Sequence, residues 1–230
     1  MNRYKHLFFD LDRTLWDFDS NSYEALKDIY ENHGLASFFE HPDEFISTYH
    51  RHNERLWAEY RDGNLTKSKL RSVRFLLTLK EKKINDPYLA EKIGEEYLRL
   101  SVLKTNLFPC THEILEYLQP SYNLYILTNG FRETQFKKMK NSGLEKYFKH
   151  VFTSETIGYN KPHLKIFQWA ISSVNARKEE CLMIGDDQKV DIAGGNAYGI
   201  DTVFFNPLGE NQEIPSKYTI NRLDELKEFL

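Results

Sequence analysis

Apolar residues follow two different patterns along the chain. Between residues 20 and 104 they recur at spacings of three and four, and no run in this stretch is typical of a strand. Helices are predicted there over about 20–33, over 42–61, from about 66 and from about 87. Pro42 and Pro87 support two of these starts because proline favours the first turn of a helix. The stretch therefore predicts four helices that pack against one another.

The rest of the chain alternates between short apolar runs and helical patterns. The run at 6–9 ends at Asp10 and is typical of a buried strand. Further strands are predicted at 123–127, 150–153, 181–184 and 201–205, and helices at 111–118, 132–141, 163–174, 189–198 and 222–229. Such alternation predicts a parallel sheet with helices on both faces. The fold class is α/β, with a core made of 1–15 and 107–230 and a helical insertion at 16–106.

Composition and charge narrow the range of partners. Hydrophobic residues make up 40% of the 230 residues and charged residues 28%, which is enough to build a core. The net charge of −3 gives no electrostatic basis for binding nucleic acid. Apolar runs extend over a few residues only, whereas a membrane span needs about 18. We therefore expect neither a nucleic acid nor a membrane partner, and both a monomer and a small homo-oligomer stay open.

The first residues and the cysteines indicate a compartment. The N-terminal sequence MNRYKHLFFDLD runs directly into the first predicted strand and shows no signal-peptide pattern. Cys110 and Cys181 are the two cysteines, too few for a disulfide framework. The sequence therefore predicts a cytoplasmic protein with reduced thiols.

Two carboxylates follow the first predicted strand, in the motif Asp10-Leu11-Asp12-Arg13-Thr14. Ligands of open parallel sheets bind beyond the carboxyl ends of the strands, so Asp10 and Asp12 can face one crevice. One carboxylate can attack phosphorus, while the other gives a proton to the leaving oxygen and later takes one from water. A polar junction between a strand and a loop would use the same residue types.

Two further segments carry groups that suit a phosphate. Thr128, Asn129 and Gly130 follow a predicted strand and offer a hydroxyl, an amide and backbone N–H groups. Lys161 precedes a predicted helix, where its charge could neutralise a phosphate in the transition state. The alternatives are a plain Asn-Gly turn and a solvated surface lysine.

An acidic cluster follows the apolar run at 181–184. It contains Asp186, Asp187 and Asp191. Carboxylates gathered at one crevice repel each other unless a cation lies among them, and Mg²⁺ is the oxygen-binding ion expected there. The same acids also suit the start of the next helix, whose dipole favours negative charge. Together, the four motifs supply the nucleophile, acid/base, phosphate anchor, cation and metal ligand that phosphoryl transfer requires.

In this order, the motifs resemble those of the haloacid dehalogenase (HAD) superfamily. They are DLDRT at 10–14, TN at 128–129, KP at 161–162 and GDDQKVD at 185–191. The resemblance extends over essentially the whole chain, because the helical insertion is similar to the family's class-one cap. It implies a Rossmann-like three-layer core with strand order 5-4-1-2-3, in which the first and fourth motifs lie on adjacent strands.

The resemblance also implies roles for individual residues. Asp10 would be the nucleophile and Asp12 the general acid/base. Magnesium would be held by the Asp10 carboxylate, the Asp12 backbone carbonyl and Asp186. The substrate's phosphate would be bound by Thr128, Asn129 and Lys161, and Asp191 would orient Lys161 or a metal-bound water from the second shell. Two positions depart from the family pattern, since Arg13 stands where glycine is most common and Asp187 where serine is common.

Within the superfamily the layout resembles the branch of pyrimidine 5′-nucleotidases. The cues are the four-helix insertion and the stretch YRDGNLTKSKLRSVRF at 60–75. Gly63 would supply a tight turn there. Two groups of side chains could approach a substrate: the basic residues Lys67, Lys69, Arg71 and Arg74, and the residues Trp16, Phe18 and Asn21. The sequence equally allows the basic residues to form a solvated helix face, and Trp16 and Phe18 to serve in internal packing.

The predicted function is therefore a Mg²⁺-dependent phosphomonoesterase that acts on a small phosphorylated metabolite through an aspartyl phosphate. A pyrimidine nucleoside 5′-monophosphate is the favoured substrate, with a sugar phosphate or phosphoglycolate as alternatives. A phosphomutase is a further possibility, which product analysis distinguishes. Asp12 and the acidic cluster argue against a 2-haloacid dehalogenase, which has no leaving oxygen to protonate and needs no magnesium. The complete set of catalytic residue types argues against a non-catalytic binding module.

Overall fold

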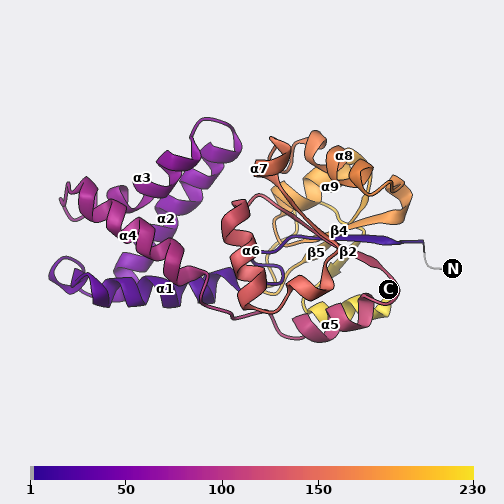
Figure 1. Cartoon of the computed structure of the whole chain (residues 1–230), viewed down its shortest axis with the longest axis horizontal. Coiled ribbons are helices and arrows are strands. Elements are labelled where there is room, and N and C mark those ends of the chain that lie inside the picture. Colours follow the sequence, from indigo (N-terminus) through magenta and orange to yellow (C-terminus); the bar gives the residue numbers. More distant parts are fainter. Residues whose placement is uncertain (1–2) are drawn as a thin grey trace. The chain divides into compact units, whose positions relative to one another are not determined.

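The computed structural model describes residues 3–230, and its central feature is one parallel sheet (Figure 1). Its strands are β1 (His6–Phe9), β2 (Asn123–Thr128), β3 (His150–Thr153), β4 (Cys181–Gly185), β5 (Asp201–Phe205) and β6 (Tyr218–Ile220). They are ordered β3-β2-β1-β4-β5-β6, and every pair of neighbours is parallel. The predicted α/β fold class and the order of its five strands are confirmed, with β1 next to β4.

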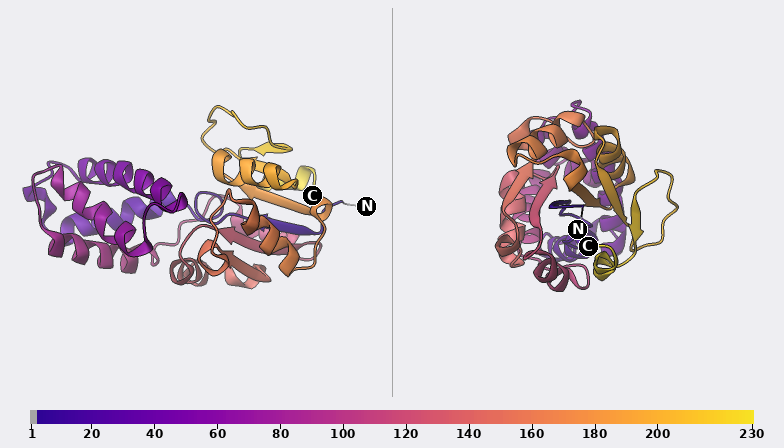
Figure 2. Two further views of the ribbon diagram at one scale, coloured as in Figure 1. Left: turned by 90° about the horizontal axis from the view of Figure 1, so that it is seen from above. Right: turned by 90° about the vertical axis from the view of Figure 1, so that its right-hand side faces the viewer.

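Side chains of successive strand residues alternate between two cores, one on each face of the sheet. Leu7 and Phe9 join a cluster with side chains of α5 and α6, whereas Phe8 joins a cluster with side chains of α8. These helices are α5 (Thr111–Leu118), α6 (Arg132–Asn141) and α8 (Leu164–Ser173). Figures 1 and 2 show helices on both faces of the sheet. The core is therefore layered as predicted.

The end of the chain differs from the sequence prediction. Strand β6 is not among the predicted strands, because a strand of three residues is too short to show an alternating pattern. It pairs with β5 through Val203–Tyr218 and Phe205–Ile220. The helix predicted at 222–229 is the 3-10 helix η5 (Leu223–Glu228), and it packs on the same face as α5. Further short helices that the sequence does not predict are η2 (Glu145–Tyr147), α7 (Ser154–Ile157) and η3 (Lys178–Glu180).

The helix predicted at 189–198 begins with a wider turn than expected. It consists of the π-helix η4 (Gln188–Ile192) followed by α9 (Ala193–Tyr198). The Asp187 side chain caps this start by accepting hydrogen bonds from the backbone N–H groups of Lys189 and Val190, at 2.9 and 3.0 Å. Such π-turns are frequent near functional sites, and this one carries Asp191.

A second compact unit comprises Asp19–Lys104, whereas the α/β unit comprises residues up to Phe18 together with Thr105–Leu230. The helices of this second, helical unit are α1 (Phe18–Asn32), η1 (Leu35–Ser37), α2 (Pro42–Arg61), α3 (Lys67–Lys80) and α4 (Pro87–Ser101). Ile29, Phe45 and Ile93 contribute to its buried core. Gly63, with a φ of 77°, lies at the turn between α2 and α3.

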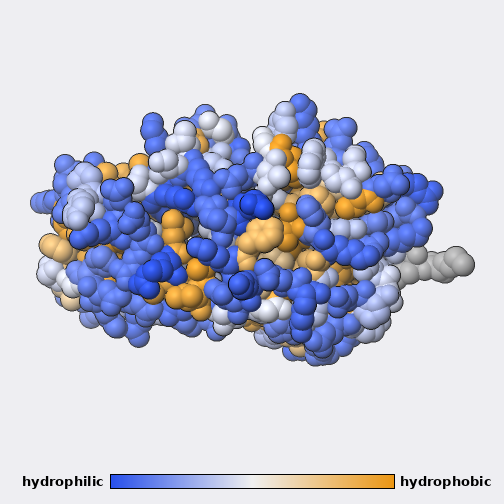
Figure 3. Space-filling view, viewed as in Figure 1, coloured by the Kyte–Doolittle hydropathy of each residue, from blue (hydrophilic) through white to orange (hydrophobic). Residues whose placement is uncertain are grey.

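Most of the surface shown in Figure 3 is polar, and its apolar side chains form small groups. Of the helices in residues 3–230, none is both long and apolar enough to span a bilayer.

Candidate active site

Three of the predicted site residues lie where neighbouring strands of the sheet end. The parallel register pairs Phe9 of β1 with Ile126 of β2 and Ile184 of β4. Asp10 follows β1, Thr128 is the last residue of β2, and Asp186 follows β4. The backbone N–H of Asp10 still donates to the carbonyl of Ile184, at 2.9 Å. The register therefore brings Asp10 together with groups that are more than 100 residues away in the chain.

Lys161 lies between two of the predicted acids. Its ammonium group contacts Oδ1 of Asp10 at 2.7 Å and Oδ1 of Asp191 at 2.6 Å, and its side chain is only 1% exposed. The Asn129 amide holds the backbone of Lys161 from both sides. It donates to the Lys161 carbonyl at 3.0 Å and accepts from the Lys161 N–H at 2.8 Å. Asn129 thus joins the end of β2 to the lysine.

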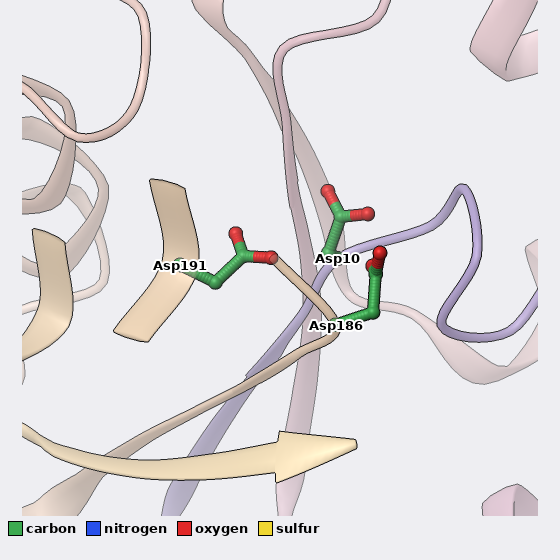
Figure 4. Close-up of side chains that lie close together, drawn as sticks. All are labelled: Asp10, Asp186 and Asp191. Atoms are coloured by element: carbon green, nitrogen blue, oxygen red, sulfur yellow. The ribbon is translucent and has the colours of Figure 1, made fainter. Parts of the chain in front are cut away.

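Asp10, Asp186 and Asp191 form a cluster of carboxylates that come from three separate segments (Figure 4). One oxygen of each lies within 4.8 Å of the others. Thr14 Oγ1 donates to Asp186 Oδ1 at 2.9 Å. The Asp187 backbone N–H donates to Asp191 Oδ2 at 3.2 Å. The cluster therefore presents several oxygen atoms to one point at the edge of the sheet.

Negative charge is crowded in this cluster. Burial, together with the carboxylates of Asp191 and Asp12, raises the pKa of Asp10 to about 7 against the opposing effect of Lys161. Burial also raises the pKa of Asp186 well above its usual range, together with its acidic neighbours Asp10 and Asp191. Burial opposes the charge of Lys161, but the two carboxylates that it contacts outweigh this effect and raise its pKa. An additional cation would relieve the crowding.

Asp12 is bound by two residues of α6 that are not among the candidates from the sequence. Lys138 Nζ contacts Oδ1 of Asp12 at 2.5 Å, and Gln135 Nε2 donates to Oδ2 at 2.9 Å. Gln135 Nε2 also lies 2.8 Å from Thr128 Oγ1. One sequence signal points to polar groups on the buried side of this helix, without identifying the two residues. Helix α6 has the sequence RETQFKKMKN, whose two apolar residues are too few to form an inward face. Its buried side must therefore be partly polar.

Comparison with known proteins decides which family has this arrangement. Residues 4–199 match the model of the haloacid dehalogenase-like hydrolase family. The chain belongs to this family. The HAD-like hydrolase is 32% identical over 234 residues to the protein YfnB of Bacillus subtilis, named as a HAD-hydrolase, and this covers 100% of the chain and 97% of YfnB. A magnesium-bound crystal structure of YfnB superposes with a TM-score of 0.90 at 30% identity, covering 99% of this chain and 98% of that one.

Two further relatives carry names that specify a reaction. The chain is 32% identical over 233 residues to the pyrimidine 5′-nucleotidase PynA of Streptococcus pneumoniae, covering 99% of this chain and 95% of PynA. It is 28% identical over 227 residues to the pyrimidine 5′-nucleotidase YjjG of Escherichia coli, covering 97% and 96%. The similarity to both relatives thus includes the helical unit as well as the α/β unit.

The carboxylates of this HAD-like hydrolase fit the divalent cation that the family implies. Mg²⁺ takes hard oxygen ligands, and the cluster of Asp10, Asp186 and Asp191 offers oxygens of this kind at spacings that one ion can bridge. Asp186 is partly exposed, so solvent can complete the coordination. Asp191 has both carboxylate oxygens engaged, Oδ1 by Lys161 and Oδ2 by the Asp187 N–H, which makes Asp10 and Asp186 the better candidates for direct ligands.

The two departures from the family pattern have local explanations. Arg13 has a φ of 64°, a left-handed conformation that glycine adopts without strain, and its guanidinium lies 4.9 Å from the centre of the Phe18 ring. Asp187 caps η4 through its side chain, a task that a serine performs equally well.

Glycines at two strand ends leave room for polar side chains. A Cβ on Gly130 would lie 2.2 Å from Nε2 of Gln135, and a Cβ on Gly185 would lie 2.3 Å from Oδ2 of Asp191. Both distances are far too short for nonbonded atoms. The sequence motifs TNG and GDD therefore need their glycines for close packing at the site.

Three of the other candidate residues from the sequence are buried within their units, whereas Lys69 is exposed. Trp16 is 1% exposed and belongs to the core of the α/β unit, and Asn21 is fully buried in α1. Arg74 is 5% exposed and donates to Oδ1 of Asn53 within the helical unit, at 3.0 Å.

Proposed function

We propose that this HAD-like hydrolase is a Mg²⁺-dependent phosphomonoesterase that acts on pyrimidine nucleoside 5′-monophosphates. The observation that carries the proposal is the meeting of Asp10, Asp186 and Asp191 at the edge of the sheet, where the buried ammonium group of Lys161 contacts Asp10 and Asp191. Such a site combines a carboxylate nucleophile with groups that can neutralise a phosphate.

The first half of the reaction transfers the phosphoryl group to the protein. The Asp10 carboxylate attacks phosphorus in line with the ester oxygen, the bond from phosphorus to that oxygen breaks, and an acyl phosphate forms on Asp10. Asp12 gives its proton to the leaving oxygen, so the nucleoside departs as a neutral alcohol. Lys161 is in contact with Asp10 and offsets the charge of the phosphoryl oxygens.

The second half releases phosphate. A water molecule attacks the acyl phosphate, Asp12 takes a proton from that water, and Asp10 is regenerated as a carboxylate. Both protonation states of Asp12 are therefore used in one cycle, and the residue returns to its starting state. Mg²⁺ would be held by the carboxylates of Asp10 and Asp186 and the backbone carbonyl of Asp12, and would reduce the repulsion between Asp10 and the anionic substrate.

Thr128 has a hydroxyl suited to anchoring a phosphoryl oxygen. Its Oγ1 accepts hydrogen bonds from the Gly130 N–H at 3.0 Å and from Gln135 at 2.8 Å. Because a hydroxyl has one proton and two acceptor sites, this arrangement leaves the proton of Thr128 to be donated. That proton is the group proposed to bind phosphate.

The substrate class rests on the similarity to PynA and YjjG, which spans the helical unit, and on the stretch at 60–75. The helical unit is proposed to act as a cap that excludes water during the reaction and opens for product release. The predicted cytoplasmic location suits an enzyme of nucleotide metabolism.

A screen for phosphate release tests this proposal. Purified protein with Mg²⁺ is given ribo- and deoxyribonucleoside monophosphates, sugar phosphates, phosphoglycolate and a 2-haloacid, and Asp10→Asn serves as the matched inactive variant. We expect the highest kcat/KM with a pyrimidine nucleotide, and a loss of about 1,000-fold or more in Asp10→Asn because an amide is a poor nucleophile.

The outcomes separate the parts of the proposal. A preference for sugar phosphates over every nucleotide would refute the nucleotidase and leave the phosphatase intact. Phosphate release that Asp10→Asn does not slow would refute the nucleophile. An isomerised sugar phosphate in place of free phosphate would indicate a phosphomutase.

A further inference from the structure

Both carboxylate oxygens of Asp12 are engaged by one helix. Oδ1 contacts Lys138 Nζ at 2.5 Å, and Oδ2 accepts from Gln135 Nε2 at 2.9 Å. Gln135 and Lys138 are three residues apart on α6, so their side chains lie on the same face of the helix. The Asp12 side chain itself is 26% exposed and remains accessible to a reactant.

Lys138 is fixed by more than its ion pair. Its side chain is only 6% exposed, and its ammonium group lies 3.9 Å from the centre of the Trp16 ring and 5.5 Å from that of Phe18. Cations are attracted to the faces of aromatic rings, most strongly to tryptophan. Trp16 is 1% exposed, and its backbone forms β-bridges with Asp12 and Leu107, so both the ring and the chain that carries it are held in place. The lysine therefore has a defined position from which to orient Asp12.

Gln135 connects two parts of the site. One amide nitrogen donates both to Asp12 Oδ2 and to Thr128 Oγ1, at 2.9 and 2.8 Å. Gln135 is 1% exposed, and Gly130 leaves the space that it occupies. Its two bonds fix the distance between the acid/base group and the hydroxyl proposed to bind phosphate.

We propose that Gln135 and Lys138 are positioning residues that hold the Asp12 carboxylate in a fixed orientation toward the bound phosphoryl group. This inference rests on the proposed function, because it concerns the proton transfers assigned to Asp12. A carboxylate that serves first the leaving oxygen and then a water molecule needs a defined orientation, and a misplacement of about 1 Å can lower a rate by roughly 100-fold. Neither residue exchanges a proton or touches the substrate in this account.

The positioning role can be tested with two substrates whose leaving groups differ in their need for a proton. A nucleoside 5′-monophosphate releases an alkoxide that needs a proton, whereas p-nitrophenyl phosphate releases a stable phenolate that does not. The value of kcat/KM reports the steps up to loss of the leaving group. For Lys138→Met and Gln135→Met we expect kcat/KM to fall by about 10- to 100-fold with the nucleotide. With p-nitrophenyl phosphate the fall for Lys138→Met should stay below about threefold. Gln135→Met also loses its bond to Thr128, so kcat/KM should fall with both substrates but clearly more with the nucleotide.

Matched controls come from the same helix. Lys137 and Lys140 are exposed residues of α6. Lys137→Met and Lys140→Met remove the same charge without touching Asp12, so they should leave both substrates unaffected. Thermal unfolding of every variant checks the fold, and Gln135→Met carries the test if Lys138→Met does not fold.

A double-mutant cycle with Asp12→Asn decides whether the effect passes through Asp12. If Lys138 acts by positioning Asp12, adding Lys138→Met to Asp12→Asn should lower the residual nucleotide activity by less than about threefold. Equal losses with both substrates, or a full additional loss in the Asp12→Asn background, would overturn the proposal. A wild-type protein that releases no phosphate would overturn the proposed function as well, whereas an Asp10-dependent activity with additive losses would overturn the positioning role alone.

Discussion

Lys161 in the α/β unit and Arg74 in the helical unit are both buried basic side chains, and their surroundings are opposite. Lys161 of the α/β unit is 1% exposed and contacts the carboxylates of Asp10 and Asp191. Arg74 of the helical unit is 5% exposed, and none of the ion pairs found among residues 3–230 includes it. In the α/β unit, carboxylates compensate the positive charge that is removed from water. In the helical unit, uncharged groups surround it.

Aromatic rings take the place of acids around Arg74. Its guanidinium carbon lies 5.0 Å from the centre of the Tyr97 ring, 5.4 Å from that of Phe75 and 5.7 Å from that of Tyr49. An amide, Asn53, accepts its one hydrogen bond that the structure describes, at 3.0 Å. Ring faces attract a cation but cannot carry a transferred phosphoryl group. Carboxylates therefore compensate the buried charge in the unit proposed to be reactive, whereas packing against aromatic rings gives Arg74 a structural role.

Replacing Lys161 should cause the largest loss of activity and stability. Lys161→Met leaves Asp10 and Asp191 buried without their cation, so we expect phosphate release to fall by more than about 100-fold. The free energy of unfolding should drop by about 3 kcal/mol. Activity assays and urea unfolding at neutral pH measure these effects. Lys165→Met, an exposed lysine of α8, is the matched control. A Lys161→Met protein as active and as stable as the control would contradict the site.

Binding of magnesium should stabilise the α/β unit. An ion that binds the folded state at about 100 times its Kd adds roughly 2.7 kcal/mol, which corresponds to about 5–10 °C in a protein of this size. Differential scanning calorimetry with EDTA and then with excess Mg²⁺ measures the shift. Asp186→Asn should reduce it strongly, whereas Asp224→Asn, at a half-buried position of η5 far along the chain from the cluster, should not. An undiminished shift in Asp186→Asn would place the ion elsewhere.

The smallest effect is expected at Arg74. In Arg74→Met the contacts with three rings are lost, but the cost of burying an unpaired guanidinium disappears with them. We expect the free energy of unfolding to change by less than about 1.5 kcal/mol in either direction. Urea unfolding of this variant beside Lys161→Met gives the direct contrast. A loss above about 3 kcal/mol would show that Arg74 has a partner as strong as a carboxylate.

The amino-acid sequence reveals the parts of the site that follow strands. Buried parallel strands have a clear apolar signal, and polar residues at their carboxyl ends must meet, so the sequence alone is enough to group Asp10, Thr128 and Asp186. It is not enough for Gln135 and Lys138, because a lysine on a helix is normally solvated and only the tertiary fold turns this one inward. The π-turn at Gln188–Ile192 is equally hidden, since it has no periodic signature.

The helical unit shows a different limit of sequence reasoning. Its four helices are predictable because their apolar spacing and their proline starts are local signals. The surroundings of its basic residues depend instead on which helices meet. The sequence would equally allow Arg74 to face a ligand, and it is the packing of α2, α3 and α4 that places it among three rings.

The register of the sheet has a consequence for synthesis on the ribosome. Strand β1 emerges first, but one of its neighbours in the sheet is β4, which supplies Asp186. At about 5–20 residues per second, roughly 4–16 s pass between completion of the helical unit at Lys104 and the appearance of Asp186. During this interval the nascent chain can fold its helices but holds an incomplete carboxylate cluster. Catalytic competence should therefore arise only near the end of translation, and a chain truncated before β4 should be inert.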